Sequence, residues 1–253
     1  MIANISTIAP RLFYNETVTT TNSGARLVFV SSKQNGGQND RFTFALTHDD
    51  VDVANPANLP TLPFGWNPVD PNDAKRSSLS IEASPEMVAF CEELDACNKR
   101  AAAANSMLWF KKEMDEDTVG LTYVPLCKEP NQAEIDKYQA KPKMSVKVTS
   151  EGDRATQIMV VVGKTVVDGA EKVKYIEGNV TNLRRNSKCH IICEAAQVWL
   201  GRGQWGLTLN ATEIIVYPSD NRKRGIEAYG DAVSNKMVKV EPTDIELAEE
   251  EEA

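Results

Sequence analysis

Histidine is scarce in this sequence of 253 residues, which contains only His48 and His190. The chain also lacks a G-x-S-x-G nucleophile motif, a P-loop, an H-E-x-x-H metal motif and a C-x-x-C pair. The acidic run Asp49-Asp-Val-Asp52 could contact a metal ion, but a solvated loop is the simpler interpretation. We therefore expect a protein without enzymatic activity, cofactor or metal.

The five cysteines are an odd number at irregular spacing, which does not fit a disulfide framework. Cys189 and Cys193 flank His190, but Lys188–Ala196 has the pattern of a β-strand, in which four residues span roughly 13 Å. That distance is too long for a shared metal ion or a disulfide bond. We expect both cysteines to be buried and reduced.

No apolar run approaches the roughly 18 residues of a membrane span. The amino terminus also lacks a basic region followed by an apolar stretch, so it does not resemble a secretory signal. These absences predict a soluble, intracellular protein without membrane contacts.

The net charge of −8 is distributed unevenly along the chain. Residues 1–140 carry −7, residues 141–240 carry +6, and residues 241–253 carry −7. Because phosphate binding depends on Lys and Arg side chains, only the basic block suits a polyanion. The bland interpretation of such charge runs is solvated surface.

The acidic tail contains no base, and it could lie in a basic groove or bind basic patches on partner proteins. A solubilising disordered end is the alternative. The tail residues assigned to partner contacts are Glu249, Glu250, Glu251 and Glu252.

One long helix is predicted from Pro85 to about Ser106, with Ser84 as its N-cap and one apolar stripe. A short helix is expected at Gln132–Gln139. The segment 49–80 is rich in Asp, Asn and Pro and is predicted to be a long loop.

The rest of the pattern is β. In the run from Lys143 to Thr149, polar and apolar residues alternate, which predicts a half-buried strand with a cationic outer face. Apolar parity changes between Ala211 and Ile214, which predicts a β-bulge near Glu213. The other predicted strands are Ala25–Ser31 and Arg41–Thr47, as a hairpin, and Thr156–Gly163, Lys172–Glu177, Lys188–Ala196 and Leu207–Tyr217.

These elements describe a mainly β (β+α) fold, namely a partly open oligonucleotide-binding (OB) Greek-key barrel with one long inserted helix and a disordered acidic C-terminal tail. A β-sandwich fits the same pattern. The expected organisation is a loosely ordered segment at 1–24, a single OB-like domain at 25–240 and the acidic tail at 241–253.

The run Gly201-Arg-Gly-Gln-Trp-Gly206 matches G-x-G-x-x-G by letter. A dinucleotide-binding fold needs a helix after the third glycine, but Leu207–Tyr217 has the pattern of a strand. A kinase needs catalytic motifs downstream, and none is present. The run is therefore a hairpin connection with Arg202 and Trp205 near its tip, unless Trp205 folds into the core.

Single-stranded nucleic acid is bound by a positive groove along its backbone and by aromatic rings that stack on unpaired bases. The basic block holds both residue types, and the hypothesis requires that they converge in space beside exposed rings. The candidate residues are Lys143, Lys147, Lys172, Lys174, Arg184, Arg185, Lys188, Trp199, Arg202, Trp205, Tyr217, Arg222, Lys223 and Arg224.

The order of features resembles the single-stranded DNA-binding proteins of short-tailed phages and their relatives in large DNA viruses of algae and protists. The resemblance rests on Trp109-Phe-Lys-Lys112, Tyr123–Lys128, Lys141–Val148, Val198–Gly201 and Gly206–Pro218, followed by the Glu-rich tail.

This resemblance implies an OB barrel with an added helix and sequence-tolerant binding of single-stranded DNA in viral replication, recombination and repair. It also implies that the acidic tail contacts a polymerase or helicase, in the host nucleus or a viral replication compartment. Phage tails of this type end in an aromatic residue, whereas this chain ends in Glu252-Ala253. Homodimerisation stays open. The alternatives are a structural β protein, such as a minor capsid or scaffold component, and an acidic-tailed chaperone of basic proteins.

Overall fold

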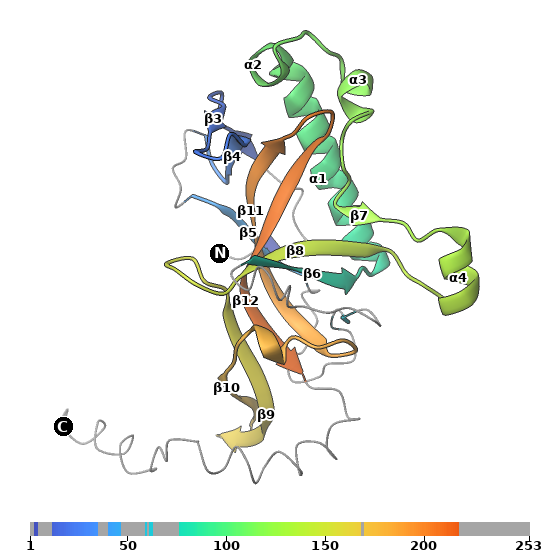
Figure 1. Ribbon diagram of the computed structural model, residues 1–253. Helices are drawn as coiled ribbons and strands as arrows, with labels where there is room; N and C mark the ends of the chain where they lie inside the picture. The colour runs from blue at the N-terminus through green and yellow to red at the C-terminus, as the bar shows by residue number, and fades with distance from the viewer. Residues whose placement is uncertain are drawn as a thin grey trace, which may run out of the picture. The chain divides into compact units, whose positions relative to one another are not determined.

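Two long antiparallel strands, β11 (Lys188–Leu200) and β12 (Trp205–Tyr217), form the centre of the sheet (Figure 1). The computed structural model describes residues 3–4, 12–34, 40–46, 59, 61–62, 76–167 and 170–217. These residues belong to one unit, Met1–Pro218. The prediction for residues 241–253 lies outside the described residues.

Each central strand shares its second edge between two shorter strands. The edge of β11 that faces away from β12 pairs first with β5 (Phe42–Ala45) and then with β4 (Arg26–Ser31), both antiparallel. The edge of β12 that faces away from β11 pairs with β8 (Lys143–Thr149) at Asn210 and with β9 (Gln157–Val167) from Glu213 onward, both parallel.

Each change of partner coincides with a β-bulge. In β11 the extra residue is Ala196, between the last residue paired with β5 and the first paired with β4. In β12 the extra residue is Thr212, between the β8 and β9 pairings. The predicted bulge near Glu213 is thus confirmed. Because bulges bend and twist a strand, the partner strands on either side of each bulge diverge.

Thr156 closes the gap between β8 and β9 beside the second bulge. Its hydroxyl donates to the Ala211 carbonyl at 2.8 Å and accepts from the Thr149 amide at 3.1 Å. The Thr156 amide donates to the Thr149 carbonyl at 2.7 Å. The side chain is buried, so these bonds replace hydrogen bonds to water.

Replacing Thr156 with valine is expected to lower the free energy of unfolding by about 2–3 kcal/mol, because the isosteric methyl leaves a buried amide and a buried carbonyl without this partner. Equilibrium urea unfolding measures the change. Thr156→Ser, which keeps the hydroxyl, serves as the control and should cost less than about 1 kcal/mol. Equal losses for both variants would show that the hydroxyl contributes nothing.

The predicted hairpin of Ala25–Ser31 and Arg41–Thr47 is wrong in its pairing. Both strands exist, as β4 and β5, but they lie end to end along β11 instead of pairing with each other. Periodicity finds strands but does not encode their partners, and the glycine-rich connection mimicked a hairpin loop.

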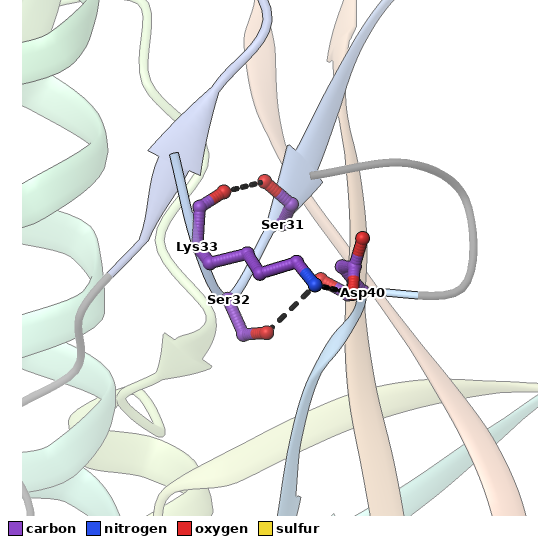
Figure 2. A network of polar contacts seen from close by, with 4 residues as sticks. All are labelled: Ser31, Ser32, Lys33 and Asp40. Atoms are coloured by element: carbon purple, nitrogen blue, oxygen red, sulfur yellow. Dashed lines mark hydrogen bonds and ion pairs between the residues drawn. The ribbon is translucent and has the colours of Figure 1, made fainter. Parts of the chain in front are cut away.

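Polar contacts join Ser31, Ser32, Lys33 and Asp40, which lie near the end of β4 and the start of β5 (Figure 2). The Ser32 amide and hydroxyl donate to the Asp40 carbonyl at 2.6 and 3.1 Å, and the Ser31 hydroxyl donates to the Lys33 carbonyl at 2.7 Å. Lys33 Nζ lies 2.6 Å from Asp40 Oδ1, but this pair is solvent-exposed and adds little. The hydrogen bonds therefore contribute most to holding these four residues together.

Strand β6 (Arg76–Glu82) occupies part of the segment predicted to be loop. It pairs antiparallel with β8 over all seven residues of each. The predicted faces of β8 are confirmed, with Met144, Val146 and Val148 buried and Lys147 exposed. Strand β10 (Ala170–Glu177) pairs with β9 as a hairpin.

Short strands complete the sheet. Strands β2 (Phe13–Tyr14) and β3 (Thr19–Thr20), from the segment predicted to be loosely ordered, pair with β4. Strand β1 (Ala3–Asn4) pairs with β5, and β7 (Cys127–Lys128) pairs with β8.

Helix α1 (Pro85–Ala104) covers one face of the sheet, here called the inner face (Figure 1). Its predicted N-cap is confirmed, because the Ser84 hydroxyl accepts from the Met87 amide at 3.3 Å. Phe90 contacts Phe44 of β5 with ring centroids 5.0 Å apart. The other helices in the described part of the chain are α2 (Ser106–Phe110), α3 (Glu116–Gly120), α4 (Gln132–Tyr138), which was predicted, and the 3₁₀ turn η2 (Val180–Asn182).

The prediction of a mainly β fold is confirmed. The described strands form one sheet whose main path runs β1-β5-β11-β12-β8-β6 and does not close on itself. None of the described helices has the length and apolar character to span a bilayer.

Candidate nucleic-acid interface

A polar depression lies on the outer face of the sheet, opposite the core side of its strands. We call it the outer trough; its volume is about 850 Å³. It is lined by β5, β11, β12, β8 and the connection 150–155 between β8 and β9. These are the segments that diverge at the two bulges. The bulges therefore shape the trough.

Strand register places the lining residues in rows across the sheet. Thr43, Glu194, Asn210 and Lys147 lie directly opposite one another across four strands. At about 4.8 Å per strand, this row spans roughly 14 Å. The Asn210 amide donates to Glu194 Oε1 at 3.3 Å. The row therefore offers both acceptors and donors to a bound molecule.

Arg41 lies at the bulge in β11. Its Nη1 atom donates to the Ala196 carbonyl and to the Val30 carbonyl, the latter at 3.2 Å. The guanidinium lies over the ring of Phe29, 5.4 Å from the centroid, an attractive cation–π geometry. Burial lowers the pKa of Arg41, and Glu194 opposes that shift. Arg41 thus supports the bulge and carries positive charge into the trough.

The charges in the trough are balanced. Arg41, Lys147 and Arg154 provide three basic side chains, and the same lining includes Glu151, Asp153 and Glu194. None of the described residues that line it is a histidine, cysteine or serine. The lining therefore suits hydrogen bonding and ion pairing.

Trp199 lies on the same outer face, next to the hairpin tip. It is half-exposed, whereas its neighbours Val198 and Leu200 are buried. The indole lies against the backbone of Gly206, the residue directly opposite; a Cβ on that glycine would approach the ring to 3.1 Å. Glycine at this position leaves room for the ring to lie against the sheet, where it is partly exposed.

Phe29 supplies a second ring on the outer face. It pairs with Gln197, which lines the trough, and it is half-exposed while Val28 and Val30 are buried. Trp199 and Phe29 thus lie on neighbouring rows of one surface, and Arg41 lies over Phe29. Aromatic rings and cations on one surface are features that single-strand binding uses.

Trp205 and Tyr217 are corrected as stacking residues, because both are buried. Trp205 is 1% exposed, its Nε1 donates to the Val119 carbonyl at 2.9 Å, and its ring contacts Trp109, Phe110 and Tyr123. Tyr217 is 6% exposed and packs in a small apolar cluster that is separate from the main core. Neither ring offers a face to a base.

The predicted cations do not converge. Lys188 and Arg202 lie at opposite ends of the β11–β12 hairpin, roughly 40 Å apart along an extended strand. Of the predicted cations that the structure describes, Lys147 alone lines the trough. The others lie elsewhere: Lys143 on β8, Lys174 on β10, and Arg184 and Arg185 after η2.

Several predicted residues lie outside the described part of the chain. This applies to the side chain of Lys172, whose backbone is in β10, and to Arg222, Lys223, Arg224, Glu249, Glu250, Glu251 and Glu252.

Sequence reasoning missed three residues of this surface: Arg41, Arg154 and Phe29. Arg41 and Phe29 lie outside the basic block, in which the candidate residues were sought. The available signal was a parity change in β11, where the buried residues shift from odd to even numbers across Ala196.

The cysteine prediction is confirmed as to burial, since Cys189 and Cys193 are 0% exposed and neither is in a disulfide. Burial also lowers the pKa of His190 between them. Within the described ranges, no group of three or more His, Cys, Asp or Glu side chains is placed to hold a metal ion.

Comparison with known protein-family models finds no match, and a search of curated proteins finds no similar sequence.

Proposed function

We propose that this protein binds single-stranded DNA without sequence preference, and that the strand lies along the outer face of β11. The predicted basic block does not converge, so the proposal rests on one observation: two partly exposed rings, Trp199 and Phe29, lie on neighbouring rows of the outer face, and Arg41, which lines the outer trough, lies over Phe29. Bases would stack on the rings, and phosphates would contact Arg41, Lys147 and Arg154.

The charge balance of the trough shapes the expected binding. Three of the described basic side chains line the trough, so contact with all of them neutralises about three phosphates and gives a slope of log K against log salt of about −2. The carboxylates lower the affinity for phosphate further. Stacking is therefore the larger contribution, and the salt dependence is shallower than the whole basic block would give.

The same proposal covers the biological setting implied by the family resemblance. We place the protein in viral DNA replication, recombination and repair, without catalytic activity. The acidic tail competes with DNA or contacts replication partners. The bulged strands and single long helix support an OB-type barrel as the fold.

Trp199→Ala is expected to weaken binding of an oligo-dT strand about 10- to 100-fold, since one lost stack costs about 1–3 kcal/mol. Fluorescence anisotropy of a labelled oligonucleotide at several salt concentrations measures both the affinity and the slope. Trp199→Phe keeps a ring and should retain most of the affinity while losing the tryptophan quenching.

Tyr138→Ala is the matched control, because Tyr138 is an exposed ring on α4 outside the trough, and its loss should leave binding unchanged. Wild-type protein that fails to bind oligo-dT at low salt would end the proposal and favour the structural β protein. Equal losses in the Trp199 and Tyr138 variants would remove the outer face of β11 as the site.

A further inference from the structure

A second depression, the α1–β7 cleft, lies between helix α1, helix α3 and residues 125–129, and its volume is about 730 Å³. It shares no lining residue with the outer trough. Two cysteines from separate elements line it: Cys91 of α1 and Cys127 of β7.

The side chains of Cys91 and Cys127 are close enough to interact, and this interaction together with burial raises the pKa of Cys91. Cys91 is 1% exposed and belongs to the core, whereas Cys127 is partly exposed and packs against that core. Cys127 is therefore the thiol that a reagent in the cleft meets first.

The cleft is acidic. Glu92, Asp95, Glu116 and Glu129 line it, against Lys99 and Lys128. This balance disfavours anionic oxidants such as glutathione disulfide. Hydrogen peroxide is small and uncharged, so it is the oxidant class that the cleft admits.

We propose that Cys91 and Cys127 are a redox modification site, at which hydrogen peroxide converts the two thiols into a disulfide between α1 and β7. The Cys127 sulfur attacks one peroxide oxygen, which gives a sulfenic acid and releases water. The Cys91 sulfur then attacks the Cys127 sulfur and displaces its oxygen as a second water. The two sulfurs lose two electrons in total, and the peroxide is reduced to two waters.

The cross-link would join residues 36 positions apart and enclose α2 and α3 in the loop. Loop closure restricts the unfolded chain, so the oxidised form should have a higher melting temperature, by about 5–10 °C. β7 pairs with β8 at Met144 and Lys143, so the disulfide would also fix α1 to the sheet.

The test treats the reduced full-length protein with hydrogen peroxide, blocks remaining thiols and digests it with a Glu-specific protease. This protease separates Cys91 from Cys97, because it cuts after Glu92 and Glu93. We expect a linked pair of the peptides Met87–Glu92 and Asp117–Glu134, since the Glu129-Pro130 bond resists cleavage, with two of the five thiols lost. Dithiothreitol should restore both thiols.

Cys97→Ser is the control, since Cys97 is partly buried on the same helix but does not line the cleft. It should still form the link and show the melting-temperature rise, whereas Cys127→Ser should show neither. A link between any other pair, over-oxidation of Cys127 with Cys91 still a thiol, or no thiol loss would each overturn the proposal.

Discussion

Trp205→Ala is expected to lower the free energy of unfolding by about 3–5 kcal/mol, as expected for removal of a large buried ring. Trp205 lies among three other aromatic rings, with the Tyr123 centroid 4.6 Å away and the Trp109 and Phe110 centroids 6.5 and 5.7 Å away. The truncation also leaves the Val119 carbonyl without the indole donor. Equilibrium denaturant unfolding at constant pH measures the loss.

Trp199→Ala is the matched comparison, because both residues are tryptophans next to the same hairpin connection. Trp199 is half-exposed, so its loss should cost about 1 kcal/mol or less. Should Trp205→Ala not fold, Trp205→Phe keeps the ring packing and loses the hydrogen bond, with an expected cost of about 1–2 kcal/mol. Equal costs for the two alanine variants would contradict the assigned burial.

The second large effect concerns Asp95 of α1 and pH. Burial raises the pKa of Asp95 to about 6, although hydrogen bonds from Tyr123 and Leu126 and the charge of Lys99 oppose that shift. Tyr123 Oη donates to Oδ1 at 2.6 Å, and the Leu126 amide donates to Oδ2 at 3.2 Å. The native state therefore binds this proton more tightly than the unfolded chain, whose Asp pKa is about 3.9.

The sign follows from linkage. Between these two pKa values the native state holds more protons, so stability falls as pH rises from about 4 through 6 and is level above that. The total contribution is about 3 kcal/mol, of which about 2 kcal/mol falls between about pH 4.5 and pH 8. Asp95 is largely buried, so solvent screening reduces this little.

Asp95→Asn removes the titration. We expect the unfolding free energy of the variant, relative to wild type, to rise by about 2 kcal/mol between about pH 4.5 and pH 8. Chemical denaturation of both proteins across that range gives the difference directly, and contributions of Glu92 and Lys99 largely cancel in it. A difference that is constant with pH would show that Asp95 titrates normally.

The elements that sequence predicted well are those with a strong local signal. Helix α1 has a capping serine, a proline in its first turn and a regular apolar stripe. Strand β8 alternates without interruption, and the parity change in β12 identified its bulge. Each of these signals lies within one element, so no knowledge of partners was needed.

The wrong predictions concern which strands pair with each other and where strand β6 lies. The end-to-end arrangement of β4 and β5 depends on the second edge of β11, which is more than 140 residues later in the chain. Strand β6 was hidden in a segment whose composition favoured loop, although Leu79 and Ile81 alternate with serines. Long-range contacts decide both, and local pattern does not contain them.

The alternation of odd and even positions could have assigned Trp199 and Trp205 to their faces of the sheet. Beyond the bulge at Ala196, the buried residues of β11 are the even-numbered Val198 and Leu200, so Trp199 faces outward. Before the bulge at Thr212, the odd-numbered residues of β12 face inward, and Trp205 is one of them. Composition alone treats both rings as equal, but the bulges assign them to opposite faces.

The contacts between Ser32 and Asp40 have a practical consequence. Strands β4 and β5 are each held to β11 by their own ladders, so these contacts lie between two separately anchored strands. Asp40 directly precedes Arg41, which lines the outer trough. A fluorophore attached at the exposed Lys33 would report on an occupied surface without replacing any residue that lines the trough.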